Sequence, residues 1–262
     1  MKLDLEDRAV LVSGGSSGVG LATVALLLSE GALVATCARG GDRLRQAMAA
    51  ISADPARSLA VECDVCSDDS AKRWIESALE RFGRLDGLVN NAGRSLMKPL
   101  YETTASEWHD ELELKFASVL NPTMAALPHL RLSGDASVVN VNALLAVQPE
   151  TRLIATSAAR AGALNLSKSL ANEFAPLGVR VNSVCLGLID TGQWERRYKE
   201  SGAALGYEAW QRELAADRRI PLGRLGRPDE VAAVIAFLVS PRSSYMTGTA
   251  VDVAGGANRG LH

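Results

Sequence analysis

Short apolar runs alternate along the chain with longer stretches in which apolar residues recur every three or four positions. The short runs predict buried strands, and the longer stretches predict helices that cover them. The expected strands are residues 8–15, 33–39, 58–65, 85–93, 136–143, 178–187 and 249–256. The expected helices are residues 20–32, 41–53, 68–82, 105–131, 150–175 and 228–239, and residues 191–219 are irregular and partly helical.

This repeated β–α–β order predicts an α/β fold of the Rossmann type, a doubly wound parallel seven-stranded sheet with helices on both faces. Ser67 and Asp68 are expected to cap the helix that follows them, and Pro122 to interrupt the long helix around it. Because no linker, repeat or low-complexity segment divides the chain, residues 1–262 are expected to form a single domain. Such sheets bind their ligands at the carboxyl ends of the strands.

The charge balance and the N-terminus narrow the class of protein. The formal net charge is −2, so we expect neither nucleic acid nor a membrane surface as a partner. No apolar run is long enough to span a bilayer, and acidic residues stand where a signal peptide needs its apolar segment. We therefore expect a soluble, cytoplasmic protein. The partner that we expect instead is a small-molecule substrate or ligand.

The cysteines and histidines do not predict a metal site. Cys63 and Cys66 have the C-x-x-C spacing, but no second pair and no nearby histidine complete a zinc set. We interpret them as small thiols at the end of a strand. His109, His129 and His262 form no ligand pattern either.

A glycine cluster follows the first expected strand. Gly14, Gly18 and Gly20 allow a tight turn and let a pyrophosphate approach the backbone, and the next helix offers free N–H groups at its start. The alternative is a plain strand-to-helix turn. The position on the first βα unit favours a dinucleotide site.

The end of the second strand bears on which dinucleotide binds. An acid there would bind the ribose of NAD, whereas an arginine can bind the 2′-phosphate of NADP. The chain has Arg39 at this place, and the first acid is Asp42. The sequence therefore favours NADP(H), with NAD(H) as the alternative if Arg39 is only a solvated loop charge.

The chain resembles the short-chain dehydrogenases/reductases of the single-domain type, nearly from end to end. The resemblance rests on SGGSSGVG (13–20), CDV (63–65), NNAG (90–93), VRVNSV (179–184) and the segment 226–256. It implies a nicotinamide-dependent oxidoreductase. It also implies a set of cofactor-binding residues: Gly14, Ser16, Ser17, Gly18, Val19, Gly20, Arg39, Asp64, Val65, Asn91, Ala92, Gly93, Arg160, Gly187, Ile189 and Thr191. Leu186 precedes Gly187 where the family usually has proline.

The catalytic positions that the resemblance implies are all changed. The family serine falls on Ala143, the tyrosine on Thr156, the lysine on Arg160 and the asparagine on Lys115. No shift of the alignment restores the tyrosine, because residues 102–197 contain none. The usual acid/base is absent rather than displaced.

The replacements offer other chemistry. Arg160 can hold a ribose hydroxyl but is always protonated, and Thr156 is a poor proton donor near neutral pH. Asn142 could reach toward a substrate oxygen. Lys115, if desolvated beside Arg160, would have a depressed pKa. The alternative is that Lys115 lies at a subunit surface with its ammonium in solvent.

Two further segments suggest partners. The stretch 191–219 contains four aromatic residues and corresponds to the mobile substrate lid of the family, which suggests a flat or apolar ligand. A subunit contact is the alternative. Small residues in 157–163 would let helices approach closely, and the family pairs these helices, so we expect a homodimer or homotetramer.

Three functional hypotheses remain at this stage. The first is an NADP(H) oxidoreductase with altered proton chemistry on a carbonyl or alcohol, using some of Lys115, Asn142, Thr156 and Arg160. The second is an NADP(H)-binding sensor or structural partner of an active paralogue, without catalysis. The third is a non-redox enzyme on the same scaffold.

Overall fold

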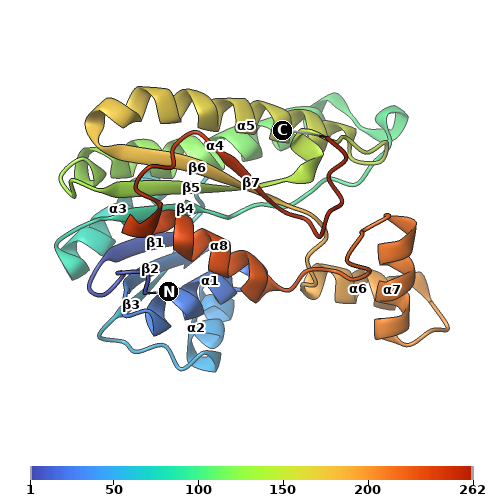
Figure 1. Cartoon of the computed structure of the whole chain (residues 1–262), viewed down its shortest axis with the longest axis horizontal. Coiled ribbons are helices and arrows are strands. Elements are labelled where there is room, and N and C mark those ends of the chain that lie inside the picture. Colours follow the sequence, from blue (N-terminus) through green and yellow to red (C-terminus); the bar gives the residue numbers. More distant parts are fainter. Residues whose placement is uncertain (1, 261–262) are drawn as a thin grey trace.

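The structure, a computed structural model that describes residues 2–260, is built around one parallel sheet (Figure 1). Both ends of the predicted domain, with His262, lie outside the described residues. The strands are β1 (Ala9–Ser13), β2 (Leu33–Ala38), β3 (Ser58–Glu62), β4 (Gly87–Asn90), β5 (Ala136–Ala143), β6 (Val179–Leu186) and β7 (Ala250–Val253). Their order across the sheet is β3-β2-β1-β4-β5-β6-β7, and each neighbouring pair is parallel. The predicted fold class is confirmed.

Helices cover both faces of this sheet. They are α1 (Gly18–Ser29), α2 (Gly41–Ala50), α3 (Asp68–Phe82), α4 (Ala105–Leu130), α5 (Ile154–Phe174), α6 (Gly192–Ser201), α7 (Tyr207–Asp217) and α8 (Pro228–Val239). Short 3-10 turns occupy Leu100–Glu102, Leu144–Ala146, Ala175–Leu177 and Pro241–Ser243. The helices α3, α4 and α5 pack on one face, and α1, α2 and α8 on the other.

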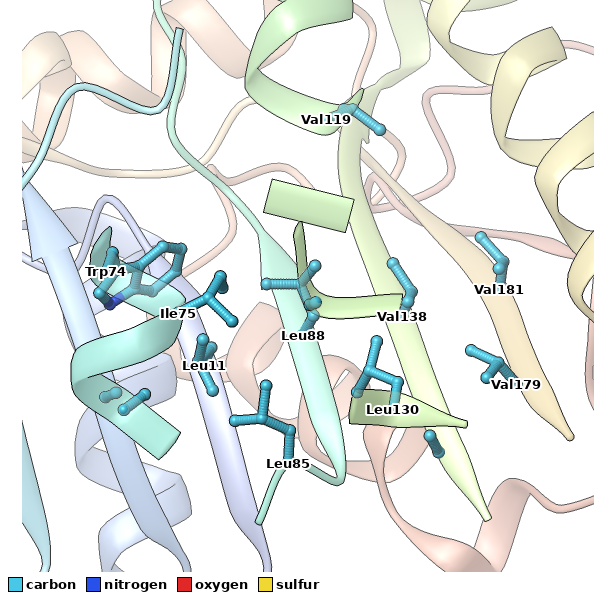
Figure 2. Packing of buried hydrophobic residues seen from close by; sticks show 14 of the residues in the cluster. Leu11, Trp74, Ile75, Leu85, Leu88, Val119, Leu130, Val138, Val179 and Val181 are labelled. Atoms are coloured by element: carbon cyan, nitrogen blue, oxygen red, sulfur yellow. The ribbon is translucent and has the colours of Figure 1, made fainter. Parts of the chain in front are cut away.

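The core lies between these helices and the sheet. Figure 2 shows Trp74 and Ile75 of α3 and Leu130 of α4 packed over strand residues such as Leu88 and Val138. All five side chains are almost fully buried. Because both faces of the sheet are covered, its central strands are apolar nearly throughout, which is why short apolar runs predicted them.

The topology fixes where a ligand can bind. After β1 the chain builds outward to β3, and then returns to place β4 beside β1. Loops at the carboxyl ends of β1 and β4 therefore part in opposite directions and leave a crevice between them. The predicted glycine turn lies at this switch point.

Ser67 caps α3 as expected, since its side chain accepts a hydrogen bond from the backbone N–H of Ser70. The prediction for Pro122 is wrong, because α4 runs through both Pro122 and Pro128 without a break. Pro122 lies on the buried face of α4 among residues such as Val119 and Ala126. Their burial against the sheet and α5 outweighs the roughly 3 kcal/mol that an internal proline costs a helix.

The segment 191–219 forms two helices, α6 and α7, that project from one end of the sheet (Figure 1). Its aromatic residues pack largely on one another, with Tyr207 and Trp210 stacked at 6.0 Å between ring centroids. Tyr198 contacts both of these rings. The aromatic cluster therefore holds α6 and α7 together.

No helix within residues 2–260 is long and apolar enough to cross a membrane. The same residues contain no group of three or more His, Cys, Asp or Glu side chains arranged to hold a metal ion.

Candidate active site

A cleft of about 1210 Å³ opens at the carboxyl ends of the strands. Loops that follow β1 to β6 line it, together with α4, α5 and α6. Every residue that the sequence predicts to bind the cofactor lies in its lining, from Gly14 at one end to Thr191 at the other. The structure therefore brings the predicted cofactor residues into one continuous surface.

The glycines at the start of the cleft are required by close backbone contacts. Gly14 has φ +77°, and a Cβ on Gly20 would lie 2.2 Å from the carbonyl oxygen of Gly14. The Asn91 side chain donates to the carbonyl of Ser13 at 2.9 Å and ties this turn to the end of β4. A side chain at Gly20 would break the turn.

The N-terminus of α1 faces the cleft with its backbone donors free of a side-chain cap. Ser17 is the N-cap residue, and its side chain makes no capping hydrogen bond. Gly18, Val19 and Gly20 follow and line the cleft. Free N–H groups and the partial positive charge of a helix start suit a bound phosphate.

Two arginines follow β2, Arg39 directly after the strand and Arg43 in the first turn of α2. Arg39 and Arg43 both line the cleft and are exposed, and neither forms an ion pair within residues 2–260. Asp42 is instead paired with Arg45. Arg43 was not predicted from the sequence, although its position four residues after Arg39 at the start of a helix could have drawn attention to it.

A buried ion pair lies at the other end of the cleft. Lys115 of α4 is 6% exposed, and its Nζ lies 2.8 Å from Oε1 of Glu111, one turn earlier on the same helix. The ammonium also donates to the carbonyl of Arg94 in the loop after β4. Lys115 lines the cleft, so the alternative of a solvent-exposed ammonium does not hold for the structure.

The surroundings of Lys115 lower its pKa from the ordinary value to about 8. Burial is the largest cause, and the nearby charge of Arg160 is the second. Glu111 acts in the opposite direction, because its carboxylate favours the protonated ammonium. A lysine of this kind can exchange a proton near neutral pH.

Arg160 and Asn142 lie together at the cleft wall. The Arg160 guanidinium donates to Oδ1 of Asn142 at 3.4 Å, and the Asn142 amide donates to the carbonyl of Arg160 at 3.0 Å. Oδ1 of Asn142 also accepts from the backbone N–H of Ala143. The Asn142 amide is therefore engaged within the chain, while the buried Nε of Arg160 has no hydrogen-bond partner in the described residues.

Thr156 is set apart from the other predicted catalytic residues. Its side chain is fully buried behind the cleft, and it does not belong to the lining. Its hydroxyl donates to Oε1 of Glu111 at 2.6 Å and accepts from the backbone N–H of Leu96 at 3.0 Å. Thr156 thus reaches Lys115 only through Glu111.

Glu111 is the central residue that sequence reasoning missed. Its Oε1 accepts from both Lys115 and Thr156, which join α4 to α5. The signal was present, because an acid four residues before a lysine on one helix forms a pair. Of the four aromatics in 191–219, Trp194 lines the cleft, and the other three do not.

Comparison with known proteins agrees with this architecture. The chain matches the family model described as enoyl-(acyl carrier protein) reductase over residues 14–258. It is 36% identical over 253 residues to cis-4-hydroxycyclohexanecarboxylate dehydrogenase of Sinomonas cyclohexanicum, covering 95% of this chain and 96% of the relative.

Among solved structures, the chain is 48% identical to a short-chain oxidoreductase of Pseudomonas aeruginosa PAO1, described as NADPH-bound and as containing an atypical catalytic center. The match has a TM-score of 0.94 and covers 98% of this chain and 99% of the other. L-sorbose reductase of Gluconobacter frateurii, solved with NADPH and L-sorbose, is 29% identical with a TM-score of 0.94 over the whole of both chains. Together, a family match over almost the entire chain and relatives that are similar from end to end show that the chain belongs to the short-chain dehydrogenase/reductase family.

Proposed function

We propose that the protein is an NADP(H)-dependent oxidoreductase that interconverts a carbonyl and an alcohol, with Lys115 as its proton donor and acceptor. The observation that carries this proposal is the ammonium of Lys115, buried in the cleft wall with a pKa of about 8. It occupies the same cleft as the dinucleotide residues, where the family tyrosine is missing.

The chain fits NADP(H) at two places. The glycine turn leaves room for the pyrophosphate beside the uncapped start of α1. Arg39 and Arg43 offer unpaired guanidinium groups for a 2′-phosphate, and Asp42 is occupied by Arg45. Two similar proteins have been solved with NADPH, which supports the choice of NADP(H) over NAD(H). When bound, NADPH supplies the hydride for carbonyl reduction.

Lys115 has a hydrogen-bond donor to spare. A lysine ammonium carries three donors, and Glu111 and the carbonyl of Arg94 accept two of them. The third can point to the carbonyl oxygen of a substrate in the cleft. The ammonium would donate its proton to that oxygen during reduction and, in the reverse direction, the neutral amine would accept the alcohol proton.

The neighbours of Lys115 have separate roles in this proposal. Arg160 keeps a fixed positive charge beside the ammonium, lowers its pKa and offers its unpartnered Nε–H to a ribose hydroxyl. Glu111 and Thr156 are positioning residues that hold Nζ of Lys115 in place. Ala143 contributes no polar group, so substrate orientation falls to other residues.

The first test is the loss of the ammonium. In Lys115→Met, we expect the rate of reduction of any carbonyl compound that the unchanged protein reduces to fall by about 10²- to 10⁴-fold, the usual contribution of a general acid. The measurement is the decay of the NADPH absorbance band with a panel of ketones and aldehydes. Lys72→Met is a matched control, because Lys72 pairs with Asp68 at the same helical spacing but on the surface. Equal rates for the two variants would contradict the proposed role.

A second function, NADP(H) binding without catalysis, is favoured by the replacement of all four family catalytic positions. Tight NADPH binding in calorimetry with no turnover on any carbonyl or alcohol would support it. If the triple change Thr156→Tyr, Arg160→Lys and Ala143→Ser alone produced activity, the native site would be degenerate.

We also propose that copies of the chain associate through α4 and α5. Leu112 and Met124 are apolar residues of α4 that remain exposed in the single chain, which fits a helix-paired dimer or tetramer. Light scattering after size exclusion tests this, and a monomer at all concentrations would exclude it.

A further inference from the structure

Two arginines lie near each other where α6 and α7 border the cleft. Arg197 belongs to α6, and Arg218 directly follows α7. Both line the cleft. Arg218 is matched by two acids, since its Nη1 lies 2.5 Å from Glu150 and its Nε lies 3.5 Å from Asp217. Glu150 and Asp217, two acids of this wall, are therefore already engaged with Arg218.

Arg197 has no acid of its own. It forms no ion pair within residues 2–260, and it is half-buried. Its guanidinium stacks on Trp194, with Cζ 4.5 Å from the ring centroid. Burial is the largest cause that lowers the pKa of Arg197, and the charge of Arg218 lowers it further, whereas the charges of Glu150 and Glu200 act in the opposite direction. The stacked ring fixes the orientation of the guanidinium, and its N–H groups remain available.

The cleft as a whole also has more positive than negative side chains in its lining. Within the described chain, nine cationic and five anionic side chains line it, although the chain as a whole has a net charge of −2. The phosphates of NADP(H) would compensate the positive charges of the arginines beside β2. Arg197 lies in α6, after β6, and makes no ion pair with any acid of residues 2–260.

Apolar residues form part of the same cleft. Leu144, Leu153 and Ile220 are nearly buried and contribute to the lining along with Trp194. A ligand that fits must therefore bring an anionic end for Arg197 and a compact apolar body. A carboxylate suits the planar fork of an arginine, because two parallel N–H···O bonds can form.

We propose that Arg197 binds a carboxylate on the substrate, so that the substrates are small carboxylic acids with an apolar skeleton and a carbonyl or hydroxyl group away from the acid. The proposal rests on the oxidoreductase function proposed above. It adds a second anchor to the cleft: Arg197 holds the acid, and Lys115 meets the reacting oxygen.

The experiment measures binding without turnover. Protein saturated with NADP⁺ is titrated in a calorimeter with cyclohexanecarboxylate and, separately, with the neutral cyclohexanecarboxamide. We expect the carboxylate to bind more tightly than the carboxamide. Arg197→Gln should weaken the carboxylate by roughly 10- to 100-fold, the worth of a hydrogen-bonded charge, and leave the carboxamide unchanged. Arg197→Lys should lie between, because it keeps the charge but loses the fork.

Arg212→Gln is the matched control, since Arg212 is an exposed arginine of α7 outside the cleft lining. Unchanged NADPH affinity in Arg197→Gln shows that the variant is folded. Equal affinity for the two probes, no binding of the carboxylate, or an unchanged carboxylate affinity in Arg197→Gln would each overturn the proposal. A chain that binds the acid through Arg197 but turns over no carbonyl would instead refute the oxidoreductase function and leave the carboxylate site standing.

Discussion

At the scale of single residues, the site depends on how Lys115 is surrounded. A surface lysine is a poor acid at neutral pH, whereas burial and a neighbouring arginine bring the pKa of Lys115 to about 8. The family resemblance suggested that Lys115 could lie beside Arg160, with an ammonium at a subunit surface as the alternative. The spacing of four residues on α4 could have indicated Glu111 as the partner of Lys115. It could not have indicated the contact of Glu111 with Thr156, since that contact depends on the packing of α4 against α5.

Opposite shifts are expected when the two charged neighbours of Lys115 are neutralised. Arg160→Gln removes a repelling charge and should raise the pKa of Lys115, whereas Glu111→Gln removes an attracting charge and should lower it. The measurement is the pH dependence of kcat for reduction at saturating NADPH. The fall in rate at high pH should move to higher pH in the first variant and to lower pH in the second. Shifts in the same direction would contradict the account.

At the scale of elements, hydrophobic pattern predicted the strands well, and their ends differ by only a few residues. The sequence pattern failed at Pro122, because the packing of α4 outweighs the tendency of proline to break a helix. It also failed at the start of α5, which begins at Ile154 rather than at residue 150. The small residues of α5 also allow close packing of helices within a single chain. A Cβ on Gly162 would lie 2.7 Å from the ring of Phe116 in α4. Such close approaches between helices depend on the fold, so sequence spacing could not assign them.

The β1–α1 turn gives a prediction at this scale. Gly20→Ala should weaken NADPH binding by at least about tenfold, because the new methyl group would clash with the carbonyl of Gly14 and with Asn91 and so distort the phosphate loop. Fluorescence titration with NADPH measures it. Gly206→Ala is the control, since nothing lies within 4 Å of a Cβ at Gly206 and its φ of −63° suits alanine. Equal affinity in the two variants would exclude the turn as the phosphate site.

At the scale of the whole molecule, residues that stabilise the fold and residues that line the cleft lie at opposite ends of the strands. Asp86 lies at the amino-terminal end of β4, opposite the cleft, and is fully buried. Its carboxylate accepts from the backbone of Ala9 at 2.8 Å, from Arg84 at 2.7 Å and from Ser133 at 2.6 Å. One side chain thus joins β1, β4 and the segment between α4 and β5, with no part in the cleft lining.

Asp86→Ala should lower the free energy of unfolding by about 2–4 kcal/mol, because it leaves the buried N–H of Ala9 and the part-buried hydroxyl of Ser133 without their acceptor. Burial raises the pKa of Asp86, but the hydrogen bonds from Arg84, Ser133 and Ala9 outweigh it and the pKa is lowered. The carboxylate therefore stabilises the fold above its unfolded pKa of about 4, and this stabilisation is lost as the pH falls through the lower folded value. Urea unfolding measured from neutral to acidic pH tests this. The free energy of unfolding should fall less on acidification in Asp86→Ala than in the unchanged protein. NADPH affinity should be unchanged, and a large change would contradict the separation.

The proton chemistry of Lys115 is tested most directly by the pH dependence of kcat/KM in both directions. Reduction needs the ammonium, so its rate should be level below a pH of about 8 and fall above it. Oxidation of the product alcohol needs the neutral amine, so its rate should rise through the same pH and then level off. In Lys115→Met both transitions should vanish and the rates should be lower by about 10²- to 10⁴-fold. Transitions that persist unchanged in Lys115→Met would show that another group carries the proton.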